Sequence, residues 1–172
     1  MAVSSEPAPG ADRGRSWRQA WLVYLHPRIA TMLCLGFSAG LPFLLVFSTL
    51  SAWLTEAGVS RTAIGLFSWV GITYSIKVVW APIVDRLGLP LLTRRLGQRR
   101  GWMLAGQIGI AAGLAGMSLL QPSEALTAVA LLALLVAFSS ATQDIAIDAF
   151  RIESAPVHQQ GAMAATYQLG YR

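Results

Sequence analysis

Between Ile29 and Thr55 the chain reads IATMLCLGFSAGLPFLLVFSTLSAWLT, which is a run of 27 residues without one charged side chain. A helix needs about 20 mostly apolar residues to cross the hydrocarbon core of a bilayer. Further charge-free runs cover residues 62–76, 101–123 and 125–143. The sequence therefore predicts several membrane-spanning helices whose connections carry the charges.

The composition of the 172 residues supports this interpretation, because 55% are hydrophobic and only 12% are charged. An average soluble domain has about 25% charged residues, so an ordinary soluble enzyme is excluded. The net charge of +5 does not indicate a nucleic-acid partner, since the basic residues flank the apolar runs without stacking aromatics around them. Cys34, the single cysteine, cannot form an internal disulfide. We expect no cofactor and no metal.

The apolar runs predict an all-α membrane protein with four complete spans and the start of a fifth, near residues 29–54, 61–84, 101–120, 125–150 and 160–172. Residues 1–15 are small and polar, which is typical of a disordered terminus. Residues 16–27 place tryptophan and tyrosine on one helical face, as expected for an interfacial amphipathic segment or for an aqueous lead-in to the first span. Residues 28–172 would then form a partial N-terminal transmembrane bundle.

Small residues inside the spans indicate close helix packing. Gly36 and Gly40 form a GxxxG pair, which allows a second helix to approach closely. Pro42 removes a backbone hydrogen bond and should bend the first helix. In the third span a stripe of glycines on one face predicts another packing surface, at Gly106, Gly109, Gly113 and Gly116.

Basic residues are distributed unequally between the two sides of the predicted bundle. With a cytoplasmic N-terminus, the cytoplasmic segments contain ten arginines, at 13, 15, 18, 28, 86, 94, 95, 99, 100 and 151. The opposite side contains Arg61 alone. The positive-inside rule therefore predicts a multi-pass membrane protein with its N-terminus in the cytoplasm.

Three ionisable residues, Lys77, Asp144 and Asp148, fall within or near the spans. Placing one charge at bilayer depth costs about 2.5–3.5 kcal/mol, so such a residue usually faces a partner or a cavity. Helical spacing puts Tyr74 on the face of Lys77. We hypothesise that this face and the face of the fourth span that carries Asp144 and Asp148 line one cavity. Lys77 would pair with Asp144 there, either keeping both groups charged or letting the carboxylate accept a proton. Alternatively, Asp148 and Arg151 form only a helix-end ion pair.

The spacing Asp144-x-x-x-Asp148 also resembles the motif with which membrane-embedded prenyltransferases hold Mg²⁺ and a diphosphate. That family carries a second aspartate-rich segment, which this sequence lacks. An enzyme is therefore not expected.

The connection between the second and third spans resembles the cytoplasmic signature of the major facilitator superfamily, G-x-x-x-D-R-x-G-R-R. Here Ala81 replaces the first glycine, and residues 87–96 separate Asp85-Arg86 from Gly97-Gln98-Arg99-Arg100. The resemblance implies a conformational switch in which Asp85 is the helix-end acid and Arg99 or Arg100 pairs with Asp148 or Glu153. A basic loop that only sets topology is the alternative.

Within that superfamily the chain resembles the AmpG-like muropeptide permeases. The similar segments occur in the same order: LGFSAGLP at 35–42, SAW at 51–53, KVVWAPIVDR at 77–86, RRGW at 99–102, SATQDIAIDA at 140–149 and LGYR at 169–172. The resemblance implies a proton-coupled importer of anhydro-muropeptides for cell-wall recycling, with a link to β-lactamase induction. Acetyl-CoA transporters and proton-coupled drug exporters remain open as alternatives.

A major facilitator bundle has two halves around a midplane site. Four spans and part of a fifth would be an N-terminal portion that lacks the C-terminal helices. We therefore expect that the 172 residues alone do not transport.

Overall fold

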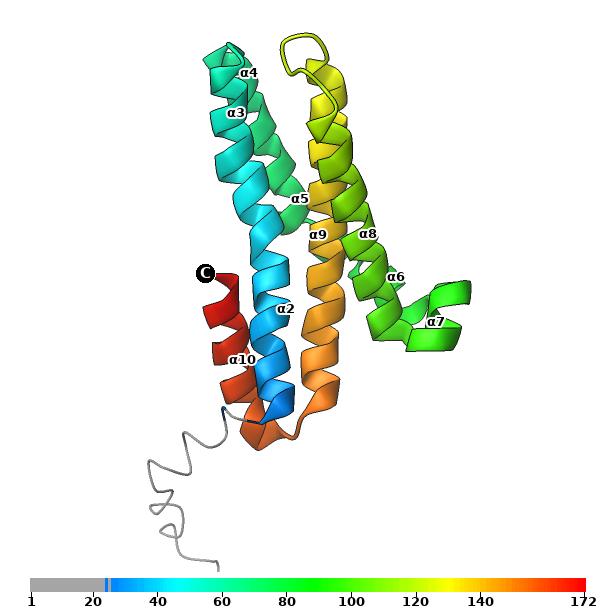
Figure 1. Cartoon of the computed structure of the whole chain (residues 1–172). Coiled ribbons are helices and arrows are strands. Elements are labelled where there is room, and N and C mark those ends of the chain that lie inside the picture. The colour runs from blue at the N-terminus through cyan, green and yellow to red at the C-terminus, as the bar shows by residue number, and fades with distance from the viewer. Residues whose placement is uncertain (1–23, 25) are drawn as a thin grey trace, which may run out of the picture.

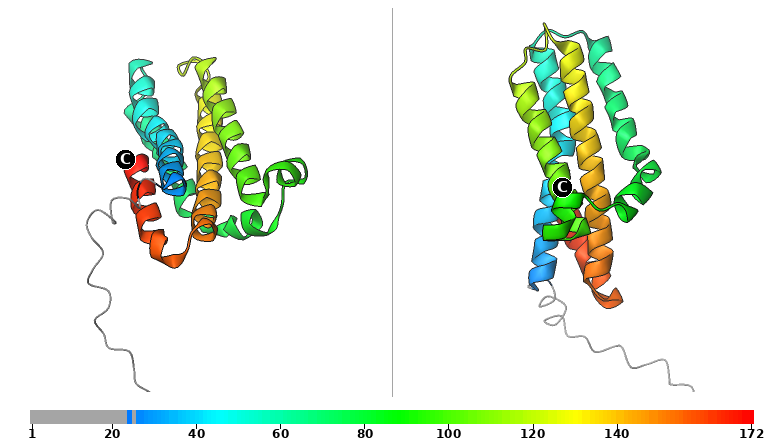
Figure 2. Two further views of the ribbon diagram at one scale, coloured as in Figure 1. Left: turned by 60° about the horizontal axis from the view of Figure 1, so that its bottom comes forward. Right: turned by 90° about the vertical axis from the view of Figure 1, so that its right-hand side faces the viewer.

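The computed structural model describes residue 24 and residues 26–172. The predicted segment 1–15 and nearly all of segment 16–27 lie outside the described residues. Within the described part every regular element is helical, and α9 lies at the centre of the arrangement (Figure 1). In two further views α10 runs beside α2, while α8 covers a different side of α9 (Figure 2).

The first long helix runs without a gap from Pro27 to Glu56. It consists of α2 (Pro27–Leu44), a π-helical turn η1 (Leu45–Thr49) and α3 (Leu50–Glu56). Pro42 lies inside α2 and has no N–H to donate to the carbonyl of Ser38. The helix widens into the π turn three residues later, a type of irregularity that often marks functional sites.

The second segment is interrupted, whereas the sequence predicted one helix over residues 61–84. Its elements are α4 (Arg61–Phe67), η2 (Ser68–Gly71), α5 (Ile72–Ser75), η3 (Lys77–Val79) and α6 (Ala81–Arg86). The regular helix is interrupted at Ile76 and Trp80, whose φ/ψ angles are −90°/5° and −104°/−2°. The ring of Pro82 would meet the carbonyl of Val78 in a continuous helix, which explains a break just before it.

The remaining helices are α7 (Pro90–Leu96), α8 (Gln98–Ser118), α9 (Leu126–Ser154) and α10 (Val157–Tyr171). Among the described residues, three helical segments are long and apolar enough to cross a membrane: 27–56, 61–79 and 126–154. Helix α8 covers the predicted third span but is not one of these three, since its glycines and Gln107 lower its hydropathy. Four complete spans and the major facilitator fold remain predictions.

Glycines bring two pairs of helices into backbone contact. A methyl group at Gly106, Gly109, Gly113 or Gly116 of α8 would press on residues of α9, namely Gln143, Ser139, Val136 and Leu132 respectively. On the other side of the bundle, methyl groups at Gly36 and Gly40 of α2 would overlap the carbonyl oxygens of Tyr167 and Tyr171 in α10. Only glycine allows backbones to lie this close.

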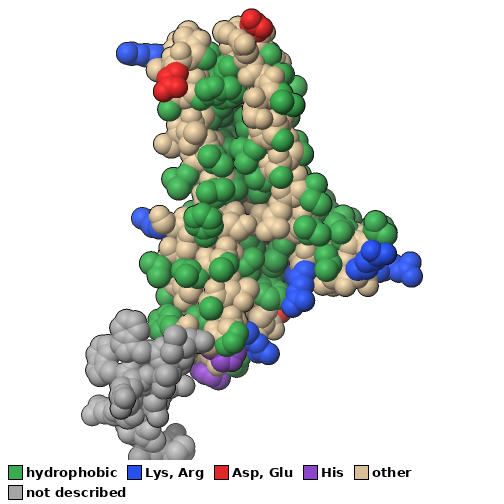
Figure 3. Space-filling view, viewed as in Figure 1, with side chains coloured by type: hydrophobic (Ala, Val, Ile, Leu, Met, Phe, Trp, Pro, Cys, Tyr) green, Lys and Arg blue, Asp and Glu red, His purple; other side chains and the backbone are tan. Residues whose placement is uncertain are grey.

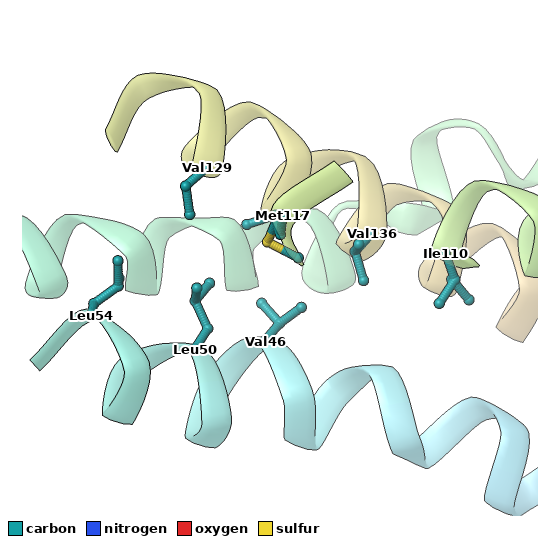
Figure 4. Packing of buried hydrophobic residues seen from close by; sticks show 8 residues of the cluster. Val46, Leu50, Leu54, Ile110, Met117, Val129 and Val136 are labelled. Carbon is teal, nitrogen blue, oxygen red and sulfur yellow. The ribbon is translucent and has the colours of Figure 1, made fainter. Parts of the chain in front are cut away.

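Apolar side chains fill the space between these helix pairs. Figure 4 shows Val46, Leu50 and Leu54 of the first helix pointing toward side chains of α8 and α9, which are Ile110, Met117, Val129 and Val136. A second cluster joins α2, α6, α8 and α9 nearer the start of α2, at Ala39, Val84, Met103, Ile145, Ala146 and Ile147. Helix α9 is buried from Ser139 to Ile147, which makes it the axis of the fold.

We predict opposite effects for two glycine-to-alanine substitutions. Gly36→Ala lowers the free energy of unfolding by about 1–3 kcal/mol, because its methyl group overlaps the backbone of α10. Gly65→Ala in α4 has nothing within 4 Å and raises it by about 0.5–1 kcal/mol through helix propensity. Thermal unfolding in detergent measures both, and a Gly36→Ala variant as stable as wild type contradicts the packing.

Candidate functional site

A lysine and a carboxylate meet where the second segment is broken. The Nζ atom of Lys77, in η3, lies 3.4 Å from Oδ2 of Asp144 in α9. The Asp144 side chain is 10% exposed and that of Lys77 is 33% exposed. The structure thus brings together the two residues that the sequence paired, and each charge compensates the cost of burying the other.

Tyrosines surround this ion pair. The hydroxyl of Tyr167, in α10, donates to Oδ1 of Asp144 at 3.4 Å. The hydroxyl of Tyr74 lies near Ser140 and Asp144, but within the described part of the chain neither it nor the Ser140 hydroxyl has a hydrogen bond of good geometry. Two buried hydroxyls beside a carboxylate provide polar atoms that a ligand or water can engage.

Aromatic rings from α2, η1, α5 and α10 form a wall next to the pair. Phe43 stands edge-on to Tyr74 with ring centroids 5.6 Å apart, and Phe47 lies 6.0 Å from the same ring. Tyr171 contacts both Phe43, at 6.3 Å, and Tyr167, at 6.0 Å. A charged pair framed by aromatic faces suits a ligand with both polar groups and apolar ring faces, such as a sugar.

A second polar cluster was not singled out from the sequence. Nε2 of the fully buried Gln143 donates to Oγ of Ser38 at 3.0 Å, and Nε2 of Gln107 donates to the same oxygen at 3.3 Å. Oε1 of Gln143 is buried without a hydrogen-bond partner among the described residues. The sequence did contain a signal for this cluster, namely Gln107 and Gln143 within otherwise apolar runs. Uncharged amides in membrane spans also form hydrogen bonds with neighbouring helices.

Asp148 lies apart from Lys77. Its Oδ1 pairs with NH2 of Arg151 at 3.3 Å, three residues along α9, which matches the helix-end ion pair considered for these residues. Asp144 is therefore the carboxylate that pairs with Lys77, while Asp148, one turn further along α9, pairs with Arg151.

Arg99 connects three helix ends. NH1 of Arg99 lies 2.6 Å from Oδ1 of Asp85, and NH2 lies 2.7 Å from Oε1 of Glu153. These bonds join α8 to the ends of α6 and α9, and the one to Glu153 is the main cause of a raised pKa at the Arg99 guanidinium. The sequence left open which arginine and which acid would pair; here they are Arg99 and Glu153. Arg86 and Arg100 are exposed.

A neighbouring amide supports this network. Nε2 of Gln98 donates to the carbonyl oxygens of Val84 at 3.1 Å and Asp85 at 2.6 Å, which caps the end of α6. The network therefore consists of one guanidinium, two carboxylates and two capped carbonyls, and these noncovalent bonds can break when the protein changes conformation.

Comparison with known proteins gives a consistent set of relatives. A family model described as acetyl-coenzyme A transporter 1 matches residues 28–170. The anhydromuropeptide permease of Escherichia coli K12 is 43% identical over 150 residues, which are 87% of this chain and 30% of that protein. The putative transporter AmpG 4 of Rickettsia conorii is 37% identical over 150 residues, or 87% of this chain and 36% of the relative.

A third relative, an uncharacterized protein of Haemophilus influenzae, is 39% identical over 137 residues, or 80% of this chain and 31% of the relative. The chain thus spans about a third of the length of these curated relatives. No solved structure matches.

We predict that Arg99 and Glu153 are energetically coupled. Arg99→Glu and Glu153→Arg each lower the thermal unfolding midpoint, whereas the double variant recovers part of the loss. The coupling is about 0.5–1 kcal/mol, since both carboxylates are substantially exposed. Arg100→Gln, at the adjacent exposed position, is the matched control and should unfold like wild type. Additive losses in the double variant would show that the two residues act independently.

Proposed function

We propose that this chain, which belongs to the transporter family described as acetyl-coenzyme A transporter 1, forms part of a proton-coupled importer of anhydro-muropeptides. The predicted resemblance to AmpG-like permeases is confirmed, because relatives with these names align with most of the chain. The observation that carries the proposal is the 43% identity to a protein named anhydromuropeptide permease. Two of the relatives are named as a permease and a putative transporter, which is consistent with transport.

The site favours a sugar-containing ligand over acetyl-CoA. Acetyl-CoA carries several phosphate charges, and phosphate groups are usually bound by arginine or lysine side chains free to pair with them. In the described segments the buried polar site has one cation, Lys77, which is already paired with Asp144. Aromatic rings and neutral hydroxyls form the rest of the site, as suits the ring faces and hydroxyls of an amino sugar.

Asp144 is the residue that we propose for proton coupling. It is ionised while Lys77 balances its charge, and it becomes neutral when it takes up a proton. Protonation would release Lys77, which could then pair with a carboxylate of the muropeptide or turn toward solvent. The Lys77 side chain is already 33% exposed. The Tyr167 hydroxyl, which contacts the other carboxylate oxygen, keeps Asp144 oriented during this exchange.

The Arg99 network is the proposed cytoplasmic gate. It holds the ends of α6, α8 and α9 together in the present conformation, and opening toward the cytoplasm would separate them. Such import would return cell-wall fragments to the cytoplasm, where recycling products feed β-lactamase induction in bacteria that have this response.

The chain would lie in the inner membrane with its N-terminus in the cytoplasm. To test this orientation, one cysteine is introduced into a Cys34→Ser background, either at Ser123 between α8 and α9 or at His158 in the first turn of α10, both of which are exposed. The turn between α8 and α9 and the start of α10 lie at opposite ends of the bundle (Figure 1). A membrane-impermeant maleimide should label Ser123→Cys in spheroplasts and His158→Cys only after lysis. The reverse pattern contradicts the orientation.

Transport is tested in a chimera, in which this chain replaces the matched 150 residues of the Escherichia coli K12 permease in a permease-null strain. We expect uptake of labelled anhydro-muropeptide. Lys77→Met should lower it by about tenfold or more through loss of a charge-assisted contact. Asp144→Asn should remove the dependence of the remaining uptake on external pH.

The control for these variants is Arg61→Gln, a charge change at the opposite end of the second segment, which should leave uptake unchanged. All variants are compared at equal amounts in the membrane. Unaltered uptake by Lys77→Met refutes the proposed role of the ion pair, and uptake of acetyl-CoA without uptake of muropeptide refutes the proposed substrate.

A further inference from the structure

Helix α7 (Pro90–Leu96) stands apart from the bundle but is held in a defined place. It projects beside the start of α8, at the end remote from the turns after α3 and α8 (Figure 1). Nε1 of Trp102, in α8, donates to the carbonyl of Leu87 at 2.7 Å. A Cβ atom at Gly101 would lie 3.3 Å from Cβ of Leu92, so one side of α7 rests on α8. These contacts fix which face of α7 is outward.

The outward side of α7 carries both apolar and basic side chains. Leu91 is 74% exposed. Leu87, just before the helix, is 58% exposed, and Leu96, at its end, is 42% exposed. Leu91, Arg94 and Arg95 are spaced i, i+3 and i+4, which puts them on one side of the helix. A leucine followed by two arginines one turn later is the pattern of a helix that inserts apolar side chains between lipids and extends its charges to the headgroups.

The charge of this region is positive and unbalanced. Five arginines lie between residues 85 and 100, and Asp85 is the single acid there. Asp85 is engaged by Arg99, which also binds Glu153. The remaining arginines are all exposed: Arg86, Arg94, Arg95 and Arg100. The space-filling view shows blue side chains at the tip of the α7 projection, next to green ones (Figure 3).

The position of α7 along the bundle places it at a membrane surface. Ten residues separate the end of the candidate span 61–79 from the start of α7. At the far end of the bundle, two acidic residues, Glu56 and Glu124, lie at the opposite turns. A helix connecting the end of one spanning segment with the start of the next lies at the boundary between hydrocarbon and headgroups. Anionic lipid phosphates are available at that depth.

We propose that α7 is a lipid-binding element, which inserts Leu87 and Leu91 into the leaflet and binds anionic phospholipid headgroups through Arg94 and Arg95. The phosphodiester is the recognised group. Each arginine near an anionic surface favours the bound state by about fivefold, so the pair contributes about 30-fold.

Lipid binding at α7 is coupled to the Arg99 network through very short connections. Gly97, with φ of 84°, is the single residue between α7 and α8, and Gln98 and Arg99 follow at once. On the other side only residues 87–89 separate α7 from α6 and Asp85. A bound α7 therefore fixes both partners of the Arg99–Asp85 bond, and anionic lipid stabilises the joined helix ends.

The test measures the depth of α7 in vesicles. In the chimera described above, with Cys34→Ser and no other cysteine, Leu91→Cys is labelled with the environment-sensitive fluorophore NBD. The protein is reconstituted into vesicles of phosphatidylcholine alone or mixed with phosphatidylglycerol. We expect blue-shifted emission and quenching by brominated lipid, both stronger with phosphatidylglycerol. Arg94→Gln/Arg95→Gln removes the difference between the two vesicle types, and Arg61→Gln preserves it.

The possible outcomes separate lipid from other partners. Emission typical of water, with quenching by aqueous iodide in both vesicle types, overturns the proposal. If inorganic phosphate at constant ionic strength abolishes the effect of phosphatidylglycerol, the site binds free phosphate instead of lipid. This result also overturns the proposal.

A second measurement does not require purified protein. A benzophenone amino acid at position 91 is irradiated in membranes of cells that express the chimera. A lipid adduct supports the proposal, whereas crosslinking to another helix of the protein or to a second copy contradicts it. Neither measurement depends on the transported substrate.

Discussion

Close approach between helix backbones is the constraint on which this structure depends. Apolar side chains gain little by leaving lipid, so helices in a membrane associate through packing and internal polar contacts. Here Gly36 and Gly40 admit α10 against α2, and the glycine face of α8 admits α9. As a result α9 is enclosed along its middle, and Asp144 and Gln143 are held among helices.

Enclosure of polar groups in turn explains the irregular second segment. A continuous helix from 61 to 84 would satisfy its own backbone but would fix Lys77 at the angle set by regular helical geometry. The break before Pro82 gives short 3-10 turns, and from one of them Lys77 reaches Asp144. Irregular backbone at membrane depth is tolerated where it is covered by protein or lines a cavity. Here the side chains of Lys77 and Trp80 bond to α9, while Val78 and Val79 remain 71% and 74% exposed.

Much of this arrangement follows from the sequence because charge inside a bilayer is costly. Lys77 and Asp144 could be paired on that ground alone, and the small-residue stripes could be recognised as packing faces. The break at Ile76–Trp80 could not, since Pro82 allows either a kinked or an interrupted helix and tertiary contacts decide between them. Nor could Ser38, Gln107 and Gln143 be grouped, because nothing in their spacing shows which helices are neighbours.

It is equally difficult to predict from the sequence which of two adjacent residues at a helix end forms a contact. Arg99 and Arg100 differ by about 100° around α8, so the packing of α8 on α9 determines which one meets Glu153. Helix α7 is too short for periodicity to predict, and its sequence reads as part of a basic loop. Yet Arg94 and Arg95, which the topology prediction counts, are exposed on α7, whereas Arg99 is engaged by Asp85. In the proposed orientation, topology signals and lipid contacts are therefore not alternatives: the arginines that the positive-inside rule keeps on the cytoplasmic side are the ones that would face the leaflet's phosphates.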